Sequence, residues 1–294
     1  MKQLILLLLI SAIFTQVSDN AYLTTESSAM VGSNVAGFGS SNSIFNNPAG
    51  LSDVEDIQLS TGGGNLYGFS WLPSYYFSIN APIPVLGNVS LGFQQLKTKS
   101  GSATLSTEKT LSVGHGLNLQ KDKNSQLSFG VVVNYVQWDL GRSAGINGDG
   151  MGETSLSLGV LNSVTIDIGF IASLRDKYRC GVNIKNINSA AIGSGMTRTV
   201  LPRRLNAGIT YLPISTLSTS ISMERLLGDS DIQIKGGLQY TLNSMVELMM
   251  GAQANPNRFG IGAKFKFNNQ TIIYSLITHP VLPITHQFSL GLSL

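Results

Sequence analysis

The residues that could do chemistry in this chain are few and widely spaced. The three histidines are His115, His279 and His286. A hydrolase needs a nucleophile beside a general base, and a zinc site needs three or four ligands at recognisable spacing. His115 lies among alternating apolar residues, and the other two flank a turn that contains proline. We therefore expect no enzyme activity, no catalytic residues, no metal and no cofactor.

Two other features have weak chemical potential. Asp53, Glu55 and Asp56 form a short acidic cluster whose carboxylates would suit calcium, although a solvated turn explains them as well. Cys180 is the only cysteine, so an intramolecular disulfide is excluded. Its position on the apolar side of an alternating segment indicates a buried or lipid-facing thiol.

A larger group of charged residues lies on the polar side of such alternating segments. The group consists of Asp167, Arg179, Lys185, Arg204, Asp231, Lys235, Glu247, Arg258, Lys264 and Lys266. Charges that face lipid cost about 2–4 kcal/mol each near the bilayer midplane. We expect these side chains to face a barrel interior, where they either anchor an internal segment and select what passes, or only solvate the interior.

The elements that position these charges are strands. From Val164 to Leu174, every second residue is apolar or small, and the same period of two recurs over 178–185, 204–211, 231–240, 258–267 and 286–294. Such alternation over about ten residues is typical of a tilted membrane strand. Less regular candidates are 56–71, 74–83, 88–97, 107–119, 125–138, 215–225, 245–253 and 270–278.

These segments predict an all-β fold, a transmembrane antiparallel β-barrel of about fourteen strands over residues 55–294. The count treats 56–71 as one strand bent at Gly62 to Gly64, and twelve or sixteen strands remain open. The last strand, with Phe288, Leu290, Leu292 and Leu294 on one side, runs to the end of the chain. It would be an exposed edge unless it paired with the first strand.

Composition supports a membrane barrel. Only 12% of the residues are charged, and the net charge of +3 is spread out, which argues against nucleic-acid binding. Residues 1–20 read as a signal peptide, because Lys2 precedes an apolar run that is too short to span a bilayer. No later run of about 18 apolar residues predicts a membrane helix. Two long connections, 139–152 and 188–200, are assigned to the outer side.

Residues 21–54 do not alternate and are rich in small residues. They include Asn47, Pro48, Ala49 and Gly50, which predict a firm turn. A compact segment of this kind could plug the barrel. Gly32 to Leu51 resembles the N-terminal hatch of FadL-like outer-membrane channels, and more closely that of the PorV/PorQ group. The resemblance continues through 167–169, 183–188, 201–211 and 279–286.

The resemblance implies two functions. The first is a plugged channel for small hydrophobic solutes, with a gap in the wall beside 56–71 and 88–97. The alternative is a non-transporting barrel that binds exported cargo proteins through its long loops as part of a secretion system. Either would be a monomer in contact with outer-membrane lipid in a Gram-negative bacterium.

Overall fold

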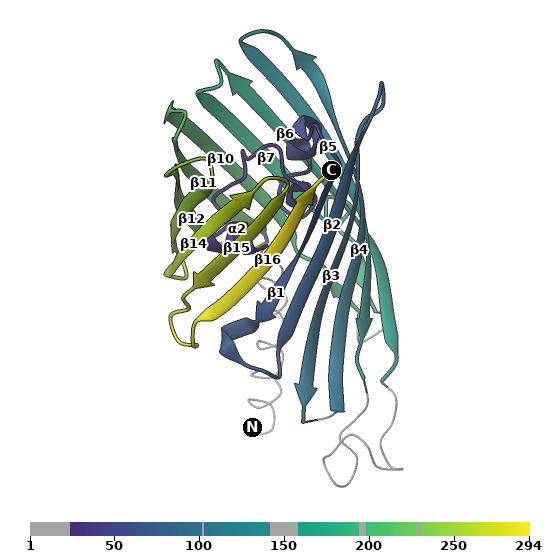
Figure 1. Ribbon diagram of the computed structural model, residues 1–294. Helices are drawn as coiled ribbons and strands as arrows, with labels where there is room; N and C mark the ends of the chain where they lie inside the picture. Colours follow the sequence, from purple (N-terminus) through teal and green to yellow (C-terminus); the bar gives the residue numbers. More distant parts are fainter. Residues whose placement is uncertain (1–23, 102, 142–157, 194–197, 229–230) are drawn as a thin grey trace.

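The computed structural model describes residues 24–101, 103–141, 158–193, 198–228 and 231–294 (Figure 1). The predicted signal peptide and most of the predicted loop 139–152 lie outside these ranges. Among the described residues, none of the helices has the length and apolar character needed to cross a bilayer.

The described chain forms a closed antiparallel barrel of fourteen strands, and a two-stranded sheet lies beside it. The barrel strands are β1 (Gln58–Asn65), β2 (Pro73–Ile83), β3 (Gly87–Ser100), β4 (Ala103–Lys121), β5 (Ser125–Asp139), β6 (Val160–Leu174), β7 (Tyr178–Lys185), β10 (Arg203–Ile214), β11 (Leu217–Leu227), β12 (Ile232–Thr241), β13 (Val246–Ala254), β14 (Arg258–Phe267), β15 (Gln270–Ile277) and β16 (Thr285–Ser293). The small sheet pairs β8 (Ala191–Ile192) with β9 (Thr199–Val200). The predicted strand number is therefore confirmed.

The first and last strands close the barrel, as the terminal alternation predicts. β1 pairs with β16 from Gln58 opposite Ser293 to Asn65 opposite His286, and it pairs with β2 along the same eight residues. The bent strand over 56–71 is wrong, because β1 ends at Asn65 and the 3-10 helix η4 (Leu66–Gly68) follows it. The wall gap expected beside 56–71 and 88–97 is also wrong, since β1 and β3 have paired neighbours on both sides.

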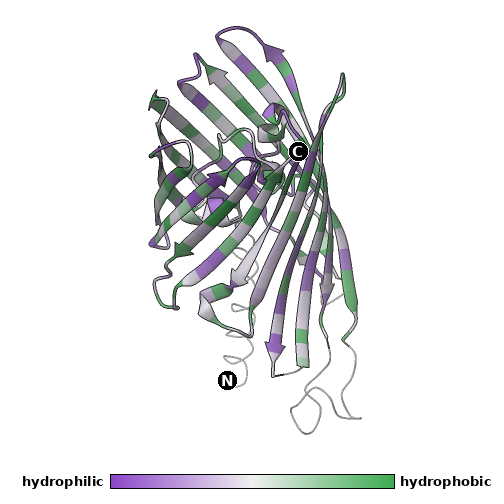
Figure 2. Cartoon of the chain, in the orientation of Figure 1, coloured by the Kyte–Doolittle hydropathy of each residue, from purple (hydrophilic) through white to green (hydrophobic). Residues whose placement is uncertain are grey.

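The two faces of the wall have opposite chemistry. On β6, Val164 is 49% exposed on the outer face, whereas its neighbour Thr165 is 6% exposed on the inner face. Hydrophilic and hydrophobic bands alternate along the strands in the same way in Figure 2. Cys180 is exposed on the apolar outer face, where a lipid-facing thiol was expected. A closed barrel is one of the two structures that satisfy every backbone polar group within lipid.

The two ends of the barrel differ. One end has tight connections, at 84–86, 122–124, 175–177, 215–216, 242–245 and 268–269, and it also holds the C-terminus. The other end has the longer connections 66–72, 140–159, 186–202 and 278–284. In outer-membrane barrels the short turns face the periplasm, so we call these the periplasmic and outer ends. Both predicted long loops belong to the outer end.

The wall near the outer end is completed by side chains where β7 is short. β7 stops at Lys185, whereas β6 begins at Val160. The Asn188 amide donates to the carbonyl of Val164 at 2.9 Å, and its oxygen accepts the N–H of Ile166 at 3.2 Å. Asn188 therefore replaces part of the missing strand ladder.

Candidate functional site

The barrel interior holds residues 24–54, which we call the N-terminal segment. It contains the α-helix α2 (Thr25–Ala29) and the 3-10 helices η2 (Ser41–Ile44) and η3 (Pro48–Asp53). Each begins at a side chain that accepts a backbone N–H of the first turn: Thr24, Ser40 and Asn47. α2 packs on β13–β16 and η3 on β3–β6, so the segment crosses the interior between opposite walls (Figure 1).

The four residues predicted to form the hatch turn are buried. Asn47 Oδ1 accepts the N–H of Ala49 at 3.2 Å, while its Nδ2 donates to the carbonyls of Val35 at 2.8 Å and Phe170 at 3.3 Å. One amide therefore caps η3, joins two parts of the segment and binds the wall. A Cβ atom at Gly50 would overlap the backbone carbonyl oxygen of Gly37, so only glycine fits there.

Two rows of inward-facing glycines let the segment approach the wall. In the first row, Gly116, Gly130 and Gly169 are register partners on β4, β5 and β6 and lie against Asn47 to Ser52. In the second row, Gly237, Gly251 and Gly260 are register partners on β12, β13 and β14 and lie against Ser28 to Ser33. A Cβ atom at Gly251 would lie 2.5 Å from the Met30 carbonyl carbon. These rows fix where each half of the segment lies.

One buried ion-pair cluster joins the segment to the barrel. Lys264 Nζ lies 2.8 Å from Glu26 Oε1 on α2 and 3.1 Å from Glu247 Oε1 on β13. Lys266 Nζ lies 3.1 Å from the other oxygen of Glu247. The four charges sum to zero, and the Lys264 side chain is 12% exposed while that of Lys266 is 46% exposed.

A second cluster lies on the wall alone. Glu224 on β11 accepts from Arg204, with an Nη1–Oε1 distance of 3.0 Å, and it also pairs with Lys235 on β12. Glu224 and Lys235 are buried, and one carboxylate with two cations gives these three residues a net charge of +1.

The remaining predicted interior charges have separate environments. Lys185 Nζ donates to the Phe45 carbonyl at 2.5 Å, and the Arg179 guanidinium lies 5.2 Å from the Phe38 ring centre, so both contact the segment. Asp167 accepts hydrogen bonds from the side-chain amide of Asn134 and from the backbone N–H of Asn186. Arg258 is buried apart from both clusters. Asp231 differs from the expectation, because it precedes β12 and is exposed at the outer end.

Sequence reasoning missed two carboxylates that organise these clusters. Glu26 lies outside any alternating segment, and its partner Lys264 is 238 positions away. Glu224 does lie in phase with inward-facing Ser220 and Ser222, so the alternation of β11 could have identified it.

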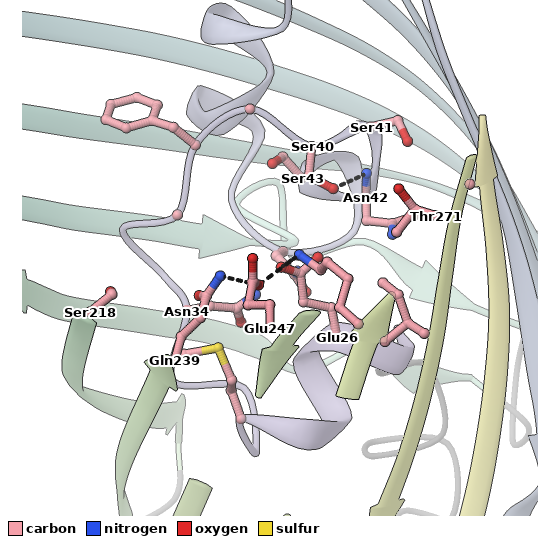
Figure 3. Close-up of a pocket in the computed structure, with 18 of the residues that line it drawn as sticks. Glu26, Asn34, Ser40, Ser41, Asn42, Ser43, Ser218, Gln239, Glu247 and Thr271 are labelled. Carbon is pink, nitrogen blue, oxygen red and sulfur yellow. Dashed lines mark hydrogen bonds and ion pairs between the residues drawn. The ribbon is translucent and has the colours of Figure 1, made fainter. Parts of the chain in front are cut away.

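The segment separates two polar cavities. The larger cavity, about 480 Å³, lies toward the periplasmic end (Figure 3). It is lined by the ion-pair cluster of Glu26, Glu247, Lys264 and Lys266, and by Gln239, Thr271 and Ser40 to Ser43. The smaller cavity, about 270 Å³, lies toward the outer end beside Lys185 and the cluster of Arg204, Glu224 and Lys235. Hydroxyl, amide and charged side chains prevail in the larger cavity, whereas the smaller one also exposes apolar side chains, among them Val136, Trp138 and Ile192.

The other residues with chemical potential lie apart from these cavities. Asp53 accepts from Lys121 and Gln126, and Glu55 and Asp56 are exposed beside it at the periplasmic end. His115 bonds to the Leu86 carbonyl on the outer face, and His286 bonds to Tyr274. In the described part of the chain, no three His, Cys, Asp or Glu side chains gather as a metal site would require. Burial, and then the nearby Arg258 charge, lower the pKa of His279.

Comparison with known proteins identifies the family. The sequence family described as type IX secretion system membrane protein PorP/SprF matches residues 40–293. The chain belongs to the PorP/SprF family. Among curated protein sequences, none matches it. The family description names a secretion system, and the resemblance to the PorV/PorQ group stays a prediction.

Solved structures share the fold at low sequence identity. The CymD monoaromatic hydrocarbon channel has a TM-score of 0.62 and 14% identity, over 94% of this chain and 98% of that chain. The Pseudomonas putida toluene transporter TodX has a TM-score of 0.61 and 14% identity, over 92% and 97%. The Ralstonia pickettii toluene transporter TbuX has a TM-score of 0.60 and 13% identity, over 94% and 98%. These likenesses support the predicted barrel fold.

Proposed function

We propose that this PorP/SprF protein is a non-conducting outer-membrane component of a type IX secretion apparatus in a Gram-negative bacterium. The observation that carries the proposal is the family match over residues 40–293. In this proposal the N-terminal segment is a permanent plug, the barrel is not an enzyme, and it works through its surfaces as a monomer whose wall closes within one chain.

The contacts of the N-terminal segment support a plug. Ser28, Ser33 and Thr25 form side-chain hydrogen bonds with Gln287, Ser220 and Tyr76 on three different strands. Lys264 and Lys185 add charged bonds to Glu26 and to the Phe45 carbonyl. Removing the segment would break all of these bonds together and expose both glycine rows, so its release would be costly.

The polar interior also favours a secretion role over the passage of hydrophobic solutes. The row of register partners Glu247, Lys264, Ile273 and Ser289 crosses four strands, and all of its side chains except that of Ile273 carry a charge or a hydroxyl group. A hydrocarbon would displace water from such groups without replacing their hydrogen bonds. The channel for small hydrophobic solutes remains the second candidate, because the fold likeness covers nearly the whole chain.

Deletion of the gene in its native bacterium tests the proposal. We expect loss of proteins exported by the type IX pathway from the culture medium, restored by the wild-type gene, with unchanged uptake of labelled toluene. Normal export together with reduced toluene uptake would overturn the proposal in favour of the channel.

A locked variant tests whether the plug must move. Ser33 Oγ and Ser220 Oγ are 2.9 Å apart, so cysteines at both positions in a Cys180→Ala background would join the segment to β11. We expect the oxidised variant to restore export as well as the reduced one. Export only after reduction would refute a permanent plug.

A further inference from the structure

A small cavity at the outer end is separate from the two large ones. It measures about 20 Å³ and lies where η4, the start of β14, the β15–β16 connection and α2 meet. Its lining includes Tyr67, Arg258, Thr278, His279, Thr285 and Gln287. A cavity of this size has room for at least one water-sized particle.

The only charged side chain in this lining, Arg258, lacks a compensating group. Arg258 is 6% exposed, and its Nε atom is buried without a hydrogen-bond partner. No carboxylate in the described part of the chain forms an ion pair with it. Glu224, which acts on Arg258 at longer range, is already bonded to Arg204 and Lys235. A buried guanidinium without a partner is costly, so the site favours a negative charge.

Two polar neighbours of Arg258 already accept backbone hydrogen bonds. Thr278 Oγ1 accepts the N–H of Phe259 at 2.8 Å, and Thr285 Oγ1 accepts the N–H of Tyr67 at 2.7 Å. Each threonine retains a hydroxyl proton to donate.

Gln287 and His279 also accept hydrogen bonds and keep N–H groups to donate. Gln287 Oε1 accepts the Ser28 hydroxyl at 2.9 Å, which leaves its amide N–H groups as donors. His279 Nδ1 accepts the N–H of Val281 at 3.2 Å and that of Leu282 at 3.1 Å, so the ring proton is on Nε2. The lining therefore offers hydrogen-bond donors around one positive charge.

We propose that this cavity binds a monoatomic anion of the halide class, with chloride as the physiological ion. The anion compensates Arg258 and accepts hydrogen bonds from the surrounding donors. A bound water would satisfy some of the donors but would not neutralise the guanidinium. Since Ser28 and Gln287 form part of the lining, the anion fastens α2 to the outer rim. The inference is independent of the secretion assignment.

Two measurements on the purified, folded full-length barrel test the site together. Crystals grown in bromide should show an anomalous peak beside Arg258. The temperature at the midpoint of the heat-induced gel-mobility shift should rise with chloride concentration until it reaches a plateau. Gluconate at equal ionic strength should not raise this temperature. The variant Arg258→Gln should lose most of this chloride effect, whereas Arg203→Gln, an exposed arginine at the same end, should keep it.

Several outcomes would overturn the proposal. One is a water molecule beside Arg258 where the bromide peak is expected. The others are a midpoint temperature that does not change with chloride, and an Arg258→Gln variant that retains the wild-type chloride effect. Bromide at Arg258 without any chloride effect on the midpoint would mean an adventitious ion only. If Arg258→Gln does not fold, the bromide peak and the chloride titration of the wild-type protein still decide.

Discussion

Removing the central charge of the Glu26–Lys264–Glu247–Lys266 cluster should destabilise both the barrel and its internal segment. Lys264→Met leaves Glu26 and Glu247, whose side chains are 17% and 5% exposed, without their shared cation. Breaking a buried ion pair costs about 3–5 kcal/mol because a desolvated charge remains. We expect the free energy of unfolding to fall by about 3 kcal/mol, the lower limit of that range. The reason is that the adjacent cavity lets solvent reach the carboxylates.

Lys266→Met is the matched control. It removes the same charge from the same Glu247, but its side chain is 46% exposed. Exposed pairs contribute about 0–1 kcal/mol, so this variant should unfold close to wild type. Adding Glu26→Gln to Lys264→Met should recover part of the loss, because Glu26 then has no ion-pair partner among the described residues, whereas Glu247 keeps Lys266.

The assay is denaturant unfolding in detergent micelles, followed by the fluorescence of Trp71 in the β1–β2 connection and of Trp138 on β5. Segment release is followed separately by maleimide labelling of Ser28→Cys in a Cys180→Ala background. Lys264→Met should label faster and unfold at lower denaturant than Lys266→Met. Equal unfolding midpoints for the two lysine variants would refute the reasoning, because burial would then not determine the cost.

Three further predictions follow from the wall and the outer rim. Gly251→Val should displace the N-terminal segment and expose it to protease, because the new Cβ would overlap the Met30 backbone. Gly236→Val should be tolerated, since the nearest atom to a Cβ there is 4.0 Å away. Equal protease resistance of the two variants would contradict the role of the glycine row. Cys180 should react in lipid vesicles with an apolar maleimide and resist a charged one, and rapid reaction with both would place its strand face in water. The folded-state pKa of His279 is lowered by burial and by Arg258, so the unfolded chain binds a proton more readily. The free energy of unfolding should therefore fall as pH drops below the unfolded pKa of about 6.5. In unfolding titrations from about pH 8 to 5, His279→Gln should make this dependence on pH weaker.

The sequence by itself determined the wall. A period of two in residues such as Val164 to Leu174 reports local backbone geometry, since successive side chains point to opposite faces of a strand. The apolar sides needed lipid, the polar sides needed an interior, and the terminal strand needed a partner. These requirements together predicted a closed barrel with the correct number of strands, and the inward phase of residues such as Lys235 and Lys264.

Tertiary structure alone decided how the interior is filled. Whether Gly116 lies beside Gly130 depends on the register between strands, and alternation within one strand does not encode register. Glu26 meets Lys264 only after the chain has passed around the whole barrel. Arg258 was predicted to face inward like the other charges, yet only the packed structure leaves its Nε atom buried without a hydrogen-bond partner. The alternation specifies which side of the wall each residue occupies, whereas pairing between distant segments specifies which charges meet.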